Sequence, residues 1–173
     1  MEGFFTKVKK FTKSDIDFSI SLKDFADYCK NHGALIAITL AIIALAHGSY
    51  IFSNNFGIDT QVFVQEPEFD YNWEGIGRFG LLLERDFLFL KPFSLYYAGV
   101  LMYIFIVLAC IMMYYTFYKI SGKDYGFIYL CIPLICFTHP IFVEQFYFKL
   151  QCAQIAFATF ITVLRNFVGV CMD

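Results

Sequence analysis

The first apolar stretch of this chain carries no Asp, Glu, Lys or Arg from Asn31 to Ile58. A helix needs roughly 20 mostly apolar residues to cross the hydrocarbon core of a bilayer. Three later stretches are also mostly apolar, although two of them contain one charged residue each, Glu144 and Arg165, and the expected spans are residues 34–53, 96–118, 126–145 and 152–171. Helices of that length could not all be hidden in the core of a chain of 173 residues. We therefore expect an all-α polytopic membrane protein.

Composition excludes several other classes of protein. Hydrophobic residues make up 59% of the chain, charged residues only 16%, and the mean hydropathy is +0.61, which is too apolar for a soluble domain. A net charge of −2 argues against a nucleic-acid partner. None of the six cysteines lies in the long loop after the first span, and no CxxC occurs. A disulfide framework and a zinc site are both unsupported.

The lysines predict how the chain is oriented in the membrane. Lys7, Lys9, Lys10 and Lys13 precede the first span, so the positive-inside rule places the N-terminus in the cytoplasm. The basic turn after the second span, at Lys119 and Lys123, agrees with that orientation. Residues 1–33 are expected to form a cytoplasmic amphipathic segment. It would lie either on the inner leaflet or against the protein's own cytoplasmic surface.

This orientation puts a long acidic loop, residues 54–95, outside the cytoplasm. Pro67 interrupts the loop, and Trp73, Gly80, Leu83 and Phe87 then recur at helical spacing. The pattern predicts a helix along the outer interface, where Trp and Tyr side chains are enriched.

The third span contains Pro133 and Pro140, so we expect a kinked helix with an irregular outer end. His139, Glu144 and Lys149 lie at that end, and polar groups at this depth usually face a cavity or a partner. In the first span, His47 is expected to be a neutral, hydrogen-bonded packing residue.

Asp59 is the candidate catalytic residue. It opens the external loop directly after the first span, at the predicted membrane surface. A carboxylate there could act as general base on a sugar hydroxyl, while cationic side chains bind a lipid-linked phosphate. No phosphate-binding glycine loop, GxSxG or HExxH motif competes with this interpretation.

Three short runs resemble the first external loop and third span of a known family. They are Phe56-Gly57-Ile58-Asp59-Thr60, Tyr71-Asn72-Trp73 with Ile76-Gly77-Arg78-Phe79-Gly80, and Thr138-His139-Pro140-Ile141-Phe142-Val143-Glu144. Through these runs, residues 34–160 resemble bacterial polytopic glucosyltransferases of the O-antigen glucosylation type, which have the GT-C fold. Many relatives pair the acid with a second Asp and follow Gly-Arg with Pro, whereas Thr60 and Phe79 stand here. A single acid leaves open whether a divalent metal takes part.

The resemblance implies transfer of a hexose, expected to be glucose, from a polyprenyl-phosphate carrier to a cell-surface glycan outside the bacterial inner membrane. Asp59 would take the acceptor proton. The implied substrate-binding residues are Tyr71, Trp73, Arg78, His139, Glu144 and Lys149. Membrane lipid, the lipid-linked sugar donor and the acceptor glycan are the expected partners.

Length separates this chain from that family, whose members have more spans and several hundred residues. The chain resembles their N-terminal part, so we expect a truncated gene product, a fragment, or one half of a split system with a C-terminal companion chain, and we do not expect it to catalyse transfer alone. The alternative is a non-enzymatic four-span membrane subunit or scaffold.

Overall fold

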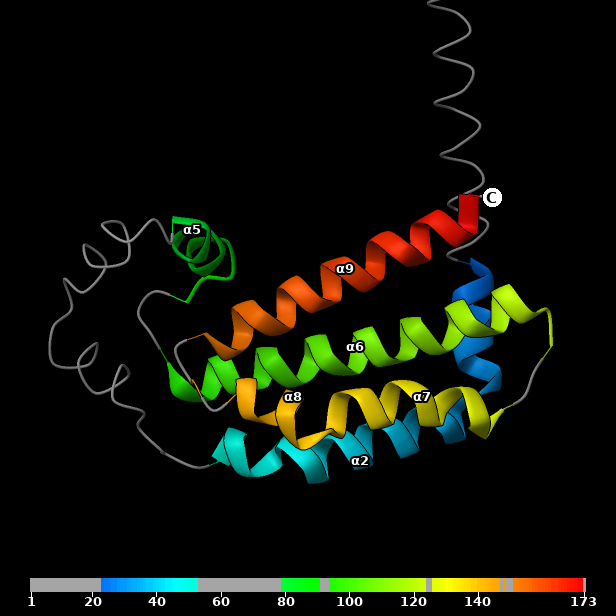
Figure 1. Ribbon diagram of the computed structural model, residues 1–173, viewed down its shortest axis with the longest axis horizontal. Coiled ribbons are helices and arrows are strands. Elements are labelled where there is room, and N and C mark those ends of the chain that lie inside the picture. The colour runs from blue at the N-terminus through cyan, green and yellow to red at the C-terminus, as the bar shows by residue number, and fades with distance from the viewer. Residues whose placement is uncertain are drawn as a thin grey trace, which may run out of the picture.

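The structure is a computed structural model, and it describes residues 23–52, 79–90, 94–123, 126–146, 148 and 151–172. Every regular element in these ranges is a helix. Four stretches of helix lie side by side in Figure 1, with α6 between α9 on one side and α2 and α7 on the other.

Helix α6 (Leu95–Ser121) is the centre of the bundle and its longest element. The Ser94 side chain caps its start by accepting a hydrogen bond from the Tyr97 N–H at 3.4 Å. At its end, Gly122 adopts a left-handed conformation (φ 63°) and donates its N–H to the Tyr118 carbonyl. At about 1.5 Å per residue, 27 residues exceed the thickness of a bilayer core.

Helix α9 (Cys152–Met172) runs parallel to α6 and makes the most extensive contact with it. Its buried and partly buried side chains include Ala153, Ala156, Phe160, Leu164 and Phe167, which recur every three or four residues as on one side of a helix. The α9 side chains in the seam between α9 and α6 are small at its start, where Ala153 and Ala156 are fully buried, and large further on, where Phe160 and Phe167 stand. This gradient explains why α9 diverges from α6 toward its C-terminal end in Figure 1.

Helix α2 (Gly33–Phe52) packs against both α6 and α7. The Tyr103 hydroxyl of α6 donates to the Leu40 carbonyl at 2.9 Å. A short helix, Lys23–Asn31, leads into α2 at a bend of 82°. Its Tyr28 is buried against the rings of Tyr114 and Tyr115. Residues 23–31 therefore pack on the protein's own surface, one of the two arrangements expected from the sequence.

The third expected span is two helices, α7 (Phe127–Thr138) and α8 (Pro140–Gln145), which meet at His139. Helix α5 (Phe79–Phe87) lies apart from the four and contacts α9, where the Phe87 and Phe157 rings are 5.6 Å apart. Figure 1 shows α5 almost end-on, beside the start of α9.

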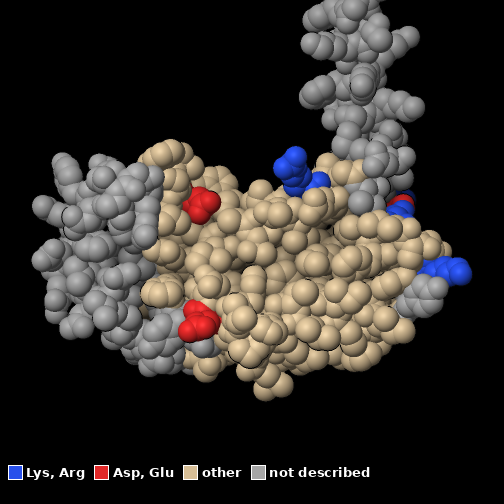
Figure 2. All heavy atoms as spheres, in the orientation of Figure 1, with Lys and Arg blue, Asp and Glu red and all other residues tan. Residues whose placement is uncertain are grey.

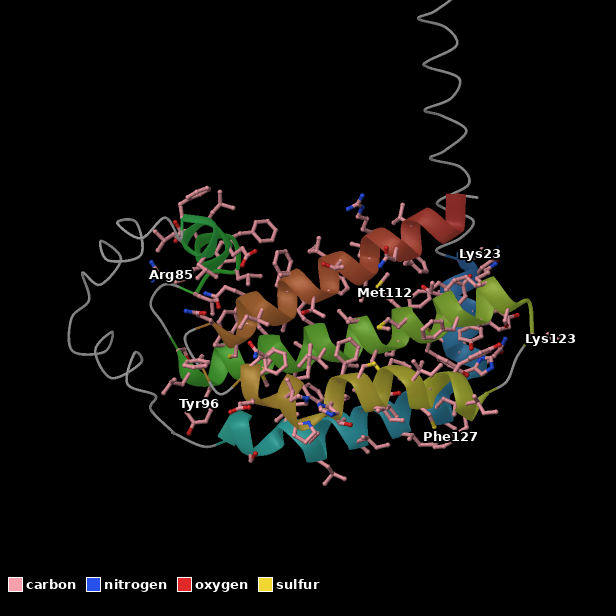
Figure 3. All side chains as sticks on the ribbon, viewed as in Figure 1. Lys23, Arg85, Tyr96, Met112, Lys123 and Phe127 are labelled. Carbon is pink, nitrogen blue, oxygen red and sulfur yellow. The ribbon has the colours of Figure 1, made fainter. Side chains whose placement is uncertain are left out.

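The bundle has two chemically different ends. At the α8 end, α2 finishes, α7 passes into α8, and α6 and α9 begin. At the Lys119 end, α2 and α7 begin and α6 finishes. Figure 3 places Arg85 and Tyr96 at the α8 end, and Lys23 and Lys123 at the Lys119 end. Figure 2 shows a broad uncharged surface between the two ends.

The expected fold class, an all-α polytopic membrane protein, is confirmed. Helices α6 and α9 are each long and apolar enough to cross a membrane, and the bent pair that includes α2 would make a third. Helix α7 is apolar but has only twelve residues. Helices lie on all four stretches where we expected spans.

Candidate functional site

The break between α7 and α8 shapes the α8 end of the bundle. Helix α7 continues through Pro133 but ends at Thr138, and Pro140 stands at the start of α8, where its missing N–H leaves no helical hydrogen bond unmade. The chain restarts as α8, with the His139 carbonyl accepting from the N–H groups of Phe142 (2.9 Å) and Val143 (3.0 Å). The break places two predicted site residues, His139 and Glu144, on a short separate helix.

His139 also caps α8 with its side chain. Its Nδ1 accepts a hydrogen bond from the Ile141 N–H at 3.3 Å. An imidazole nitrogen that accepts carries no proton, so the neutral ring must hold its proton on Nε2. The His139 ring is exposed. It therefore offers an N–H donor at this end of the bundle, a group suited to an anionic oxygen.

The two sides of α8 differ in character. Phe142 and Phe146 turn toward the bundle, and their rings form an edge-to-face series with Phe137 of α7 at 5.2 and 5.1 Å. Ile141 and Glu144 are exposed on the other side. Packing of the aromatic side thus leaves the Glu144 carboxylate accessible.

His47 joins α2 to this break. Its ring is fully buried, and its Nε2–H donates to the Phe137 carbonyl at 2.9 Å. The ring also meets Phe146 edge to face at 5.4 Å. His47 is therefore the buried, hydrogen-bonded packing residue that the sequence predicted.

Helix α5 presents its aromatic residues outward and its arginine inward. Phe79, Leu83 and Phe87 are largely exposed, whereas Arg85 is 1% exposed. Burial also raises the pKa of the neighbouring Glu84 carboxyl. A buried guanidinium group is rare, and it marks the α8 end as a place where the protein holds a positive charge away from solvent.

Gln154, in the first turn of α9, is the second buried polar group that the sequence did not reveal. It is 1% exposed, and neither amide atom has a hydrogen-bond partner in the described ranges. Leaving a buried amide unpaired is unfavourable, and such groups are often found at functional sites. Helical spacing in residues 73–87 puts Arg85 on the side opposite Leu83 and Phe87 but does not show which side is buried, and no sequence signal pointed to Gln154.

Five of the predicted site residues lie outside the described residues: Asp59, Tyr71, Trp73, Arg78 and Lys149. The structure describes the other two, His139 and Glu144, and brings both to the α8 end with Arg85 and Gln154. Within the described ranges, no group of three or more His, Cys, Asp or Glu side chains is placed to hold a metal ion.

A pocket of about 260 Å³ lies at the Lys119 end, and Tyr28, Asp24 and Asp27 are among the residues that line it. A cation of the protein itself, Lys119, already occupies the position beside these acidic side chains. The Lys119 ammonium lies 3.4 Å from the Asp24 carboxylate and 5.7 Å from the centre of the Tyr115 ring. We therefore place the candidate site at the α8 end.

Comparison with known families gives one match. The sequence profile of the family described as Glucosyl transferase GtrII matches residues 48–169, well over half of the chain. No curated protein and no solved structure gives a significant match. The matched range contains every residue of the predicted site and runs from the end of α2 through α9.

Proposed function

Because this chain belongs to the GtrII glucosyl transferase family, we propose that it takes part in moving a hexose, glucose, from a polyprenyl-phosphate carrier to a cell-surface glycan. The family match is the observation that carries this proposal. Membership implies a sugar donor and an acceptor, and helices long and apolar enough to span a membrane support a membrane location for the reaction. The carrier, the outer face of a bacterial inner membrane and a cytoplasmic N-terminus are the finer parts of the proposal.

In the proposed reaction, a hydroxyl oxygen of the acceptor attacks the anomeric carbon of the sugar, and the bond from that carbon to the phosphate oxygen breaks. The hydroxyl proton passes to the Asp59 carboxylate, acting as general base. Polyprenyl phosphate leaves with the negative charge. Positively charged groups and N–H donors around that phosphate lower the barrier because charge develops there as the bond breaks.

The remaining site residues are proposed to bind the substrates. Arg78, Lys149 and the Nε2–H of His139 would contact the donor phosphate. Tyr71 and Trp73 would stack on sugar rings. Glu144 would accept hydrogen bonds from sugar hydroxyls. Two described features support this part: the exposed Glu144 carboxylate and the proton position that the α8 cap imposes on His139.

The test is a transfer assay with radiolabelled polyprenyl-phosphate-glucose and acceptor glycan, on membranes containing this chain together with any companion chain it requires. Asp59→Asn should lower transfer by roughly 10²-fold or more, because a general base contributes about that much. Asp70→Asn removes an acid from the same loop and is the matched control. Equal activity of the two variants would exclude Asp59 from the reaction.

One observation favours a second candidate, a non-enzymatic membrane subunit. Helices α2, α6 and α7 expose large apolar side chains such as Leu45, Ile104 and Ile135. Helix α9 instead exposes Thr162, Arg165, Asn166 and Gly169 on one side. Small and polar residues in spans usually pack against another helix.

A subunit role predicts that Thr162→Leu and Gly169→Leu break up a native complex, measured as its mass in nanodiscs. It also predicts that no form of the protein transfers sugar. Transfer by the intact assembly that depends on Asp59 would decide for the enzyme.

A further inference from the structure

We propose that His47 is a positioning residue: by holding the Phe137 carbonyl, it fixes the angle at which α8 leaves α7 and so sets where His139 and Glu144 lie. The bond joins residues 90 positions apart in the sequence. The functional consequence rests on the proposed function, whereas the structural part does not.

The break between α7 and α8 leaves the Phe137 carbonyl without its ordinary helical donor. In a continuous helix this carbonyl would accept from the N–H of the residue four positions later, Ile141. At the break, that N–H is taken by the His139 side chain instead. The carbonyl is thus released from the helix ladder inside an apolar bundle, where an unpaired backbone group is strongly unfavourable. His47 supplies the missing donor at 2.9 Å.

The bond to the Phe137 carbonyl fixes both the proton position and the orientation of the His47 ring. A carbonyl only accepts hydrogen bonds, so Nε2 must carry the proton and Nδ1 of the neutral ring does not. Nδ1 has no hydrogen-bond partner in the part of the chain that the structure describes. The bond to Phe137 is accordingly the polar contact that orients the ring. The edge-to-face contact with the Phe146 ring further limits the orientation of the imidazole.

The His47 ring has contacts on either side of α8. His47 contacts the last turn of α7, through the Phe137 carbonyl, and the residue just after α8, through the Phe146 ring. Phe142 lies between, packed on both phenylalanines. One buried side chain of α2 therefore links the end of α7 to the end of α8, and its loss should free α8 to change its angle.

Side-chain reach provides a sharp test. Glutamine places an amide N–H₂ as many bonds from Cα as the His47 Nε2, asparagine places it one bond closer, and leucine has no donor. We would compare His47→Gln, His47→Asn and His47→Leu in nanodiscs, in a background without native cysteines. A spin label at Ile141→Cys, an exposed position on α8, reports its motion. A label at Ile128→Cys, exposed in the first turn of α7, is the control.

We expect the label at position 141 to become clearly more mobile in the Asn and Leu variants and to stay as in the wild type with Gln. The label at position 128 should not respond. Equal mobility at position 141 in all variants would overturn the proposal, and so would equal changes at both positions. If His47→Leu does not fold, the Gln and Asn pair decides.

Transfer activity then separates this inference from the proposed function. If both hold, kcat should fall about tenfold or more in the Asn variant and be restored by Gln, because misplacing a group by ~1 Å can lower rates by up to about 10²-fold. If the label responds as expected but the wild type shows no transfer, the proposed function fails and the positioning role stands. If transfer is present and unaffected by Asn, the link from α8 angle to activity is wrong.

Discussion

The close contact between α6 and the start of α9 can be tested by enlarging one alanine. Ala156 is fully buried in that seam, whereas Ala158, two residues later on the same helix, is exposed. Replacing either with leucine adds three carbon atoms. At position 156 they must enter space that α6 fills, but at position 158 they extend into lipid or detergent.

The expected magnitudes differ accordingly. Adding methylene groups to a well-packed interior destabilises by about 1–3 kcal/mol. Since each 1.4 kcal/mol is tenfold, Ala156→Leu should lower the ratio of folded to unfolded protein by about 5-fold to about 150-fold. Ala158→Leu should change it by less than about 0.5 kcal/mol, as surface substitutions usually do. The defect should also reach α5, which rests on this part of α9.

Two native thiols suit the assay. Cys110 of α6 and Cys152 of α9 are both fully buried, so a thiol-reactive fluorophore labels them only on unfolding. With the other cysteines changed to alanine, labelling against denaturant gives the unfolding midpoint of each variant. If Ala156→Leu and Ala158→Leu unfold together, the seam is not close-packed at this point, and our explanation for the divergence of α9 is wrong.

Three further predictions concern single side chains. Burial raises the pKa of the Glu84 carboxyl in the folded protein. The contribution of this group to folding stability is therefore fully present below the pKa that it has in the unfolded chain, and it is lost as the pH rises through the raised pKa of the folded protein. A fluorophore at Leu83→Cys should report tighter docking of α5 in mild acid, and Glu84→Gln should remove that pH dependence; an unchanged dependence would exclude Glu84. Gln154→Leu should raise the unfolding free energy by about 1 kcal/mol, because it removes a buried amide that has no hydrogen-bond partner among the described residues. A fall in stability in the same thiol assay would show that the amide is paired after all. Gly122→Ala should cost about 1 kcal/mol and Gly122→Asn less, since φ is 63° there; equal midpoints for the two would contradict a left-handed cap.

Helix positions could be predicted from the sequence because the physical rule behind them is local. A bilayer core of fixed thickness disfavours charge, so a long, mostly apolar run predicts a helix without knowledge of its neighbours. An irregular third span was predictable because prolines disrupt helices, but the sequence did not reveal that the break would fall at Pro140 while α7 continues through Pro133. These features need only the residues that form them.

Contacts across the bundle could not be predicted in this way. The place of His47 within an apolar span suggested that it would be hydrogen-bonded but could not identify a carbonyl 90 residues away as its partner. Periodicity in residues 73–87 predicted a helix, yet it left open which side faces the protein. The structure turns Arg85 inward and the phenylalanines outward. A helix at an interface can bury either side, and only its neighbours decide which.

The distribution of buried polar groups links the fold to the candidate site. Burying an imidazole, an amide or a guanidinium group costs free energy that apolar side chains of similar size would not. Among the described residues, the three such groups, His47, Gln154 and Arg85, come from α2, α9 and α5 and all lie toward the α8 end. At the Lys119 end, by contrast, the Lys119 and Asp24 side chains are paired while each remains more than a third exposed, an arrangement that costs little. Hydroxyl groups are also buried toward the Lys119 end, in Tyr28, Tyr114 and Tyr115, but each belongs to an otherwise apolar ring. The buried imidazole, amide and guanidinium groups are found at the end of the bundle that also holds His139 and Glu144, which supports placing the candidate site there.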